Sequence, residues 1–312
     1  MFWHLKNHTY SIGVDLGNDC VKIAQLADGK EGTALVAAKE LKRPDDVKAG
    51  STQWQRWAID VLHEAMGNGG FRGKDVVAAM PAGDVFVDHV KASKASEGKT
   101  EDVIFSRIKQ KLPFEAVRQN VMMKYVATSP ESFLVMAVER TNIERHLAIY
   151  ERAGLTIKSV GVWPVAIANC YARFFGRRQS DLSAVVMLLD TQPDCTNLVV
   201  SRHKEPLFAC SIPIGAGVLG DEKMLTRLVF EIGASKRNFT AIHKDAQIGR
   251  MIFLSGPVVD TEIYRAIAKQ VGIQAQMGDC LAAVECGDHQ QCGIDRRNGK
   301  VSWATAFGLS VS

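Results

Sequence analysis

Residues 10–26 read YSIGVDLGNDCVKIAQL, two apolar runs separated by a polar, turn-prone tip at 17–19. Apolar runs on either side of a short polar turn are typical of a β-hairpin. Residues 184–201, AVVMLLDTQPDCTNLVVS, repeat the design, again with an aspartate, Asp190, at the end of the first run. Such an internal repeat predicts two lobes built on one plan.

The segments that follow each hairpin predict helices and further strands. After the first hairpin come a strand-like run at 33–39, an apolar helical face between Trp54 and Ala65, and a buried strand at 75–80. After the second hairpin comes a strand at 207–214, followed by a helix. Strands that alternate with helices in this way predict a layered α/β fold. A length of 312 residues is more than one hydrophobic core usually organises.

The pattern changes between 85 and 154, where a strand, a helix, two strands and a further helix form a unit of their own. We therefore expect an inserted subdomain in this stretch. The predicted boundaries assign 1–84 and 155–181 to lobe 1, 85–154 to the insertion, and 182–312 to lobe 2.

Composition narrows the class of protein. Hydrophobic residues make up 46% of the chain and charged residues 23%, which is ordinary for a folded globular protein. The net charge of +4 comes from 38 basic and 34 acidic residues mixed along the chain, a pattern that gives little support to nucleic-acid binding. No run of 18 apolar residues and no signal-peptide pattern occurs, so we expect a cytoplasmic protein without a membrane span.

Seven cysteines scattered over a long chain favour reduced thiols over a disulfide framework, which agrees with a cytoplasmic location. Cys280, Cys286, His289 and Cys292 lie close together in what reads as a polar loop. Their spacing contains no Cys-x-x-Cys pair, so free thiols are favoured over a zinc site.

The first turn carries the residues best suited to hold phosphate. Backbone N–H groups of such a turn can bind phosphate oxygens, a lysine adds positive charge, and an aspartate can bind hydrated Mg²⁺. An ordinary hairpin turn with a surface lysine is the alternative. The candidate residues in the first turn are Asp15, Gly17, Asn18, Asp19 and Lys22. Their counterparts in the second hairpin are Asp190, Gln192 and Thr196, with Asp15 and Asp190 as the metal candidates. A third element is the apolar strand at 252–254 that runs into Ser255 and Gly256, a strand-to-helix turn that can pass close to a nucleoside. Gly215 and Gly217 complete the candidate set.

Four segments together resemble the PilM family, the actin-like proteins of type IV pilus assembly. Their order and spacing carry the resemblance over nearly the whole chain. They are SIGVDLGNDCVKIAQL at 11–26, LVMAVERTNIERHLAIYERAGLTIKSVGVWPVAIAN at 134–169, IPIGAGVL at 212–219 and WATAFGLSV at 303–311.

The resemblance implies a two-lobed actin-like (RNase H-like) fold in which 85–154 is a 1C-type subdomain. It implies ATP and Mg²⁺ as cofactors, with at most weak ATPase activity. It also implies a scaffold role in a type IV pilus or a related type II secretion or competence machine, peripheral to the inner membrane. The partner would be the cytoplasmic tail of a PilN-like inner-membrane protein, held between subdomains 1A and 1C. A pilus motor ATPase and a second copy of the chain are further candidate partners.

Three departures from the family pattern put nucleotide binding in doubt. The second turn has Gln192 where the family has glycine, followed by Pro193, which has no N–H to donate. The adenosine turn reads Gly256-Pro257 in place of Gly-Gly, and 216–249 is short for a full subdomain 2B. A working actin-like ATPase or a sugar-kinase-like phosphotransferase is the alternative function, although no separate catalytic base stands out.

Overall fold

The computed structural model describes residues 8–30, 32–92, 99–286, 294 and 301–312. Its two large sheets follow one plan: three antiparallel strands, then two parallel ones. The sheet of lobe 1 has the order β14-β3-β2-β1-β4-β8, and that of lobe 2 has the order β11-β10-β9-β12-β13. Apart from the edge strand β14, the two orders are equivalent, so the internal repeat predicted from the sequence is confirmed.

The strands of lobe 1 are β1 (Thr9–Leu16), β2 (Cys20–Asp28), β3 (Thr33–Lys42), β4 (Asp75–Ala79), β8 (Thr156–Gly161) and β14 (Glu285–Cys286). Those of lobe 2 are β9 (Val185–Thr191), β10 (Thr196–Arg202), β11 (Glu205–Ile212), β12 (Ile248–Phe253) and β13 (Ala275–Met277). The helices are α1 (Thr52–Asn68), α2 (Lys99–Ile108), α3 (Arg140–Arg152), α4 (Trp163–Phe174), α5 (Glu222–Ile242), α6 (Thr261–Val271) and α7 (Ala304–Ser310).

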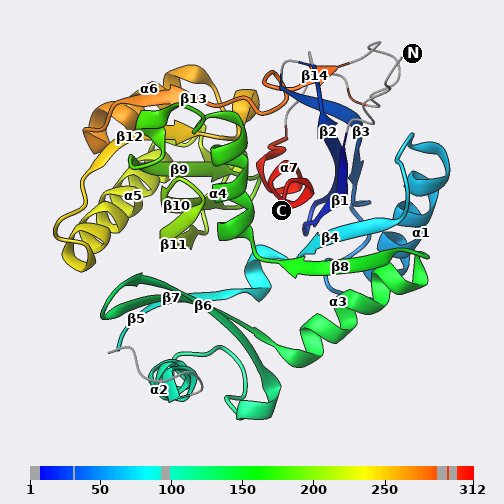
Figure 1. Ribbon diagram of the computed structural model, residues 1–312, viewed down its shortest axis with the longest axis horizontal. Coiled ribbons are helices and arrows are strands. Elements are labelled where there is room, and N and C mark those ends of the chain that lie inside the picture. Colours follow the sequence, from blue (N-terminus) through cyan, green and yellow to red (C-terminus); the bar gives the residue numbers. More distant parts are fainter. Residues whose placement is uncertain (1–7, 31, 93–98, 287–293, 295–300) are drawn as a thin grey trace, which may run out of the picture.

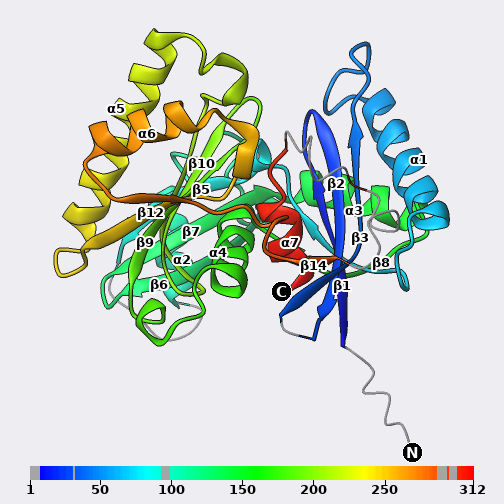
Figure 2. The same ribbon diagram turned by 90° about the horizontal axis from the view of Figure 1, so that it is seen from above.

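Helices cover both faces of each large sheet. In lobe 1, α1 and α3 pack on the outer face, and in lobe 2, α5 and α6 do so. Helices α4 and α7 lie between the two sheets, as Figures 1 and 2 show from two directions. One continuous core links the lobes through these central helices and includes Leu26, Trp163, Leu188 and Phe307.

A third, smaller sheet lies below lobe 2 in Figure 1. It consists of β5 (Phe86–Lys91), β6 (Val121–Ser129) and β7 (Ser132–Glu139) in the order β5-β7-β6, with α2 packed against it. His89 joins this sheet to lobe 2, because its ring stacks on Phe208 and its Nε2 accepts the N–H of Ala209. Of the stretch 85–154 that was expected to form a unit of its own, β5, β6, β7 and α2 belong to this sheet, whereas α3 packs on lobe 1.

The close approach of α7 depends on two glycines. A β-carbon at Gly13 in β1 would lie 2.1 Å from the carbonyl oxygen of Ala306, and one at Gly308 would lie 1.8 Å from that of Ala166 in α4. The hydroxyl of Ser310 adds two bonds, since it donates to Ser11 O and accepts the N–H of Leu26. Helix α7 is thereby held tightly against both the first hairpin and α4.

Candidate functional site

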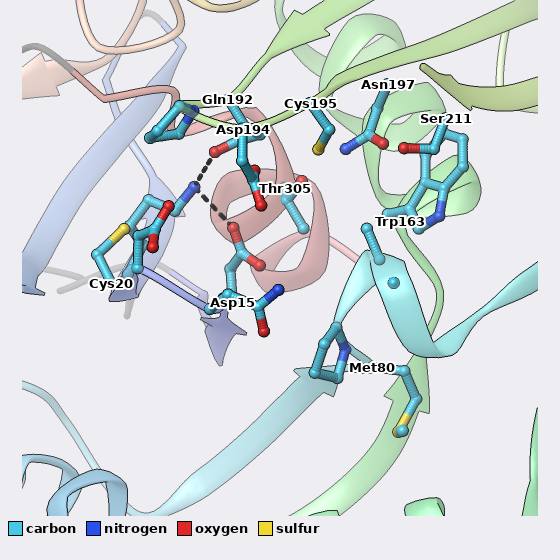
Figure 3. A pocket seen from close by; sticks show the side chains of 18 of the residues that line it. Asp15, Cys20, Met80, Trp163, Gln192, Asp194, Cys195, Asn197, Ser211 and Thr305 are labelled. Atoms are coloured by element: carbon cyan, nitrogen blue, oxygen red, sulfur yellow. Dashed lines mark hydrogen bonds and ion pairs between the residues drawn. The ribbon is translucent and has the colours of Figure 1, made fainter. Parts of the chain in front are cut away.

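The two hairpins meet at a cleft between the lobes, shown in Figure 3. The cavity has a volume of about 260 Å³ and is lined by both hairpin turns, the loop after β4, and the first residues of α4 and α7. Half of the twelve predicted site residues line it, and nearly all of these come from the first hairpin. They are Asp15, Gly17, Asn18, Asp19, Lys22 and Gln192.

Strand register places Asp15 and Lys22 together. The two residues are directly opposite in the antiparallel pair of β1 and β2. Side chains alternate between the faces of a sheet, so Ile12, Val14 and Leu16 point to the outer helices and Asp15 points to the cleft. The Lys22 ammonium then lies 2.8 Å from Asp15 Oδ2.

Lys22 also reaches across the cleft to the other lobe. Its Nζ donates to Gln192 Oε1 at 2.9 Å, and Gln192 Nε2 in turn donates to Asp190 Oδ2 at 2.8 Å. Figure 3 shows the first part of this chain as dashed lines that connect Asp15 and Gln192 through one ammonium group. The chain Asp15–Lys22–Gln192–Asp190, which we call the cross-lobe bridge, therefore ties the hairpins together with the protein's own side chains.

The bridge is buried, and this shapes its electrostatics. Only 2% of Lys22 and none of Asp190 is exposed to solvent. Burial, the largest single effect, would lower the pKa of Lys22, but the combined attractions of Asp15, Cys20 and Asp190 outweigh it, so the pKa is raised and the side chain stays charged. Burial raises the pKa of Asp190, against the opposing effects of Lys22, Ser302 and Gln192.

The other six predicted residues lie outside the cavity. Thr196 donates its hydroxyl to the carbonyl of Ile214 at 2.8 Å, and Ser255 Oγ accepts the N–H of Thr191. Both hydroxyls thus stabilise the second hairpin from behind. Asp190 does not line the cleft and is linked to it by the hydrogen bond that it accepts from Gln192. The six residues are Asp190, Thr196, Gly215, Gly217, Ser255 and Gly256.

Gly215 covers the backbone of the second turn. A β-carbon there would lie 2.5 Å from the nitrogens of both Asp194 and Cys195, and the N–H of Gly217 already donates to Pro193 O at 3.0 Å. The amide groups that would cradle a phosphate on this side are therefore packed against protein. Asn18 and Asp19 of the first turn and Asp194 and Cys195 of the second turn all line the cavity.

The cleft is small and acidic. The cavity is lined by three carboxylates, from Asp15, Asp19 and Asp194, and by one ammonium group, from Lys22. Without a bound cation, its formal charge of −2 repels phosphate, and its volume is below the range of about 300–1,000 Å³ usual for small-molecule sites. Within the described part of the chain, no group of three or more acidic, histidine or cysteine side chains is placed to hold a metal ion.

Sequence reasoning missed two features of the cleft. The contact of Gln192 with Lys22 joins residues 170 positions apart, and no local pattern signals it. Trp163 Nε1 and Asn197 Oδ1 also line this region, and each is buried without a hydrogen-bond partner among the residues that the structure describes. The cleft thus contains two buried polar groups, outside the cross-lobe bridge, that have no hydrogen-bond partner among the described residues.

The cysteine cluster near the end of the chain differs from the expected polar loop. Cys280 is buried with its Sγ 3.2 Å from that of Cys170, and Cys286 belongs to β14, whereas His289 and Cys292 lie outside the described residues. Cys280 is therefore buried beside a second thiol and is not exposed in a loop. No helix in the described ranges has both the length and the apolar character needed to cross a bilayer.

Comparison with solved structures places the fold. The chain is similar to the structure described as "PilM-PilN type IV pilus biogenesis complex", with a TM-score of 0.78 and 16% identity over 97% of this chain and 98% of that one. It is also similar to a Bacteroides thetaiotaomicron protein with an actin-like ATPase fold, at TM-score 0.50 and 10% identity over 91% and 96% of the two chains. The ethanolamine utilization protein EutJ from Carboxydothermus hydrogenoformans matches at TM-score 0.50 and 14% identity over 97% and 89%.

These likenesses show that the two-lobed α/β architecture is actin-like. A search of curated proteins found no match. The family described as "Type IV pilus assembly protein PilM" matches residues 13–226, which are more than half of the chain and include both hairpins and the small sheet. The chain therefore belongs to the PilM family of type IV pilus assembly proteins.

Proposed function

We propose that this protein is a cytoplasmic scaffold that docks the cytoplasmic tail of a PilN-like inner-membrane protein during type IV pilus assembly, and that it binds ATP and Mg²⁺ only weakly. Family membership and the likeness to the PilM–PilN complex support the first part. The single observation that carries the docking proposal is a narrow groove beside the small sheet.

This groove has a volume of about 170 Å³ and lies between α1, α3 and the loop that leads from β4 into the small sheet. Its walls carry Trp54 from α1, Asp84 from the loop, and Asn142 and Arg145 from α3. Arg145 is exposed and donates to the Asn142 side chain and to the Thr141 carbonyl, which fixes its guanidinium at the groove.

Two features of the groove support a peptide ligand, namely a donor with no partner among the described residues and a pair of opposite charges. Trp54 is 5% exposed, and its Nε1 has no hydrogen-bond partner in the described part of the chain. A buried donor of this kind is costly unless a ligand or water satisfies it, and a peptide carbonyl would do so. Arg145 and Asp84 place opposite charges along the same groove, which would orient the peptide.

A binding titration tests the docking proposal. The probe is a synthetic peptide with the sequence of the cytoplasmic tail of the PilN homologue from the same organism. Loss of a central aromatic or arginine contact typically costs about 2 kcal/mol, or about thirtyfold in affinity. We expect such a loss for Arg145→Ala and a smaller one for Trp54→Phe, which keeps the ring and removes the N–H.

Arg152→Ala is the matched control, since Arg152 is exposed on the same helix and does not line the groove. Equal affinity for the parent, Arg145→Ala and Arg152→Ala would refute docking at this groove.

The proposal of weak nucleotide binding has its own support. Phosphates that enter the cleft must displace Gln192 from Lys22 and approach three carboxylates. Calorimetric titration of the parent with ATP and Mg²⁺ tests this, and we expect a dissociation constant of about 100 μM or weaker. Submicromolar binding would contradict the proposal and favour a nucleotide-driven enzyme.

A further inference from the structure

A second cavity opens between the lobes, away from the cleft. Its volume is about 690 Å³, and it is lined by the β2–β3 hairpin of lobe 1, the C-terminal part of α4 and the β10–β11 turn of lobe 2. We call it the Arg173 pocket. It brings Arg173, Arg177, His203 and Lys204 together, and Asp28 is the single carboxylate among its described lining residues.

The charge of the Arg173 pocket is opposite to that of the cleft. With His203 neutral, two arginines and one lysine against Asp28 give the lining residues a formal charge of +2, or +1 when the Glu285 carboxylate beside Gly29 and Gly32 is included, whereas the cleft carries −2. A concave surface lined by charges of one sign concentrates ions of the other sign. Between the two cavities, an anion is therefore attracted to the Arg173 pocket and repelled by the cleft.

One wall of the pocket is held rigidly. The Arg173 guanidinium lies 2.9 Å from Asp28 Oδ1, donates from Nε to Thr33 Oγ1 at 2.6 Å, and lies over the Tyr10 ring at 5.3 Å from its centroid. The Tyr10 hydroxyl donates to the same Asp28 oxygen at 2.6 Å. Tyr10 and Arg173 lower the pKa of Asp28, which stays ionised and holds both of them through its Oδ1.

The remaining cations lack such partners. Arg177 and Lys204 are exposed, and neither lies within 4 Å of a carboxylate in the described ranges. They come from segments of different lobes, so their convergence is repulsive unless an anion lies between them. Glu31, which is next to the lining residue Gly32 in the sequence, is outside the described residues.

We propose that the Arg173 pocket binds an anion that carries one or more phosphate groups. The planar arginine fork pairs with phosphate through two parallel N–H···O bonds, and Lys204 adds a point charge from the opposite lobe. The volume of 690 Å³ lies within the usual range of small-molecule sites, about 300–1,000 Å³. A soluble polyphosphate compound and the headgroup of an anionic phospholipid share this chemistry.

Calorimetric titration with sodium tripolyphosphate, without a metal ion, tests the proposal on the whole chain. Loss of two charge-assisted contacts should weaken binding by at least about tenfold in the Arg177→Ala/Lys204→Ala variant. The matched control is Arg107→Ala/Lys109→Ala, which removes the same charge from exposed positions at the end of α2 and just after it. We expect the control to bind as the parent does, with affinity falling as salt rises.

Sedimentation with vesicles of phosphatidylcholine, alone or mixed with phosphatidylglycerol, separates the two sources. Binding to the mixed vesicles that tripolyphosphate competes away identifies a lipid headgroup, and tripolyphosphate binding without vesicle binding identifies a soluble ligand. Absence of tripolyphosphate binding by the parent, or equal losses in the two double variants, would overturn the proposal.

Discussion

The two hairpins share a strand plan but differ in what their turns offer. The β1–β2 turn keeps Gly17 and leaves Asn18 and Asp19 at the cavity, whereas the β9–β10 turn has Gln192 and Pro193 and is packed against Gly215. Lys22 of the first hairpin supplies a charged ammonium group, and the side-chain amide oxygen of Gln192 in the second hairpin accepts its hydrogen bond. Two hairpins with the same strand plan can therefore carry different turns, and here the two turns bond to each other through side chains across the cleft.

Removal of the Lys22 charge should have the largest effect on the two hairpins. Lys22→Met leaves Asp15 and the fully buried Asp190 without their cation. Loss of one partner of a buried pair costs about 3–5 kcal/mol, and we expect about 3 kcal/mol in the free energy of unfolding because Asp15 is partly exposed. Urea denaturation followed by circular dichroism measures it.

Lys158→Met is the control, because the Lys158–Asp75 pair is about half exposed on both sides, and it should cost less than about 1 kcal/mol. Adding Asp15→Asn to Lys22→Met should recover part of the loss. Equal midpoints for Lys22→Met and Lys158→Met would show that the bridge contributes nothing.

A second test makes the two turns alike. Gln192→Gly restores the glycine that the family pattern has at this position, and it removes the bonds to Lys22 and Asp190. We expect a loss of about 2 kcal/mol in unfolding free energy and a gain in affinity for ATP with Mg²⁺, since Lys22 becomes available. Unchanged affinity together with the full loss of stability would mean that Gly215 and the carboxylates, not the glutamine, exclude the nucleotide.

A third test uses pH. Because burial raises the pKa of Asp190 in the folded protein, the unfolded chain releases this proton at lower pH, and the stability that the group contributes falls as pH rises above about 4. Asp190→Asn should therefore gain stability relative to the parent as pH rises above about 4, by no more than about 1.4 kcal/mol per pH unit. A difference between parent and variant that stays constant with pH would contradict the raised pKa.

The smallest effect is expected at Thr196, whose hydroxyl we assign to the stability of the second hairpin. Thr196→Val removes the hydroxyl that donates to Ile214 O and leaves the shape unchanged, so a loss of about 1 kcal/mol in stability is expected. Affinity for ATP should not change, because the hydroxyl does not line the cavity. If Thr196→Val weakened ATP binding more than Lys22→Ala did, the second hairpin would be the one that holds phosphate.

Local patterns account for most of what the sequence predicted correctly. The first hairpin, expected at 10–26, forms as Thr9–Asp28, and the helix expected between Trp54 and Ala65 forms as Thr52–Asn68. Strands β13 and β14, of three and two residues, were missed because so few positions show no periodicity. The pairing of Asp15 with Lys22 follows from hairpin register, but the reach of Lys22 to Gln192 depends on how the lobes close.

The tight seating of α7 against β1 has a consequence for how the protein is made. Ser310 bonds to Ser11 across 299 positions of the chain, and Gly13 leaves room for nothing but the backbone of α7. The inner face of the first sheet thus stays uncovered on the ribosome until the chain through residue 310 has emerged. Contacts this distant in sequence slow folding and leave apolar surface exposed meanwhile. The first hairpin is therefore made before α7 but reaches its final packing only after α7, and a chaperone that shields it would act over that interval.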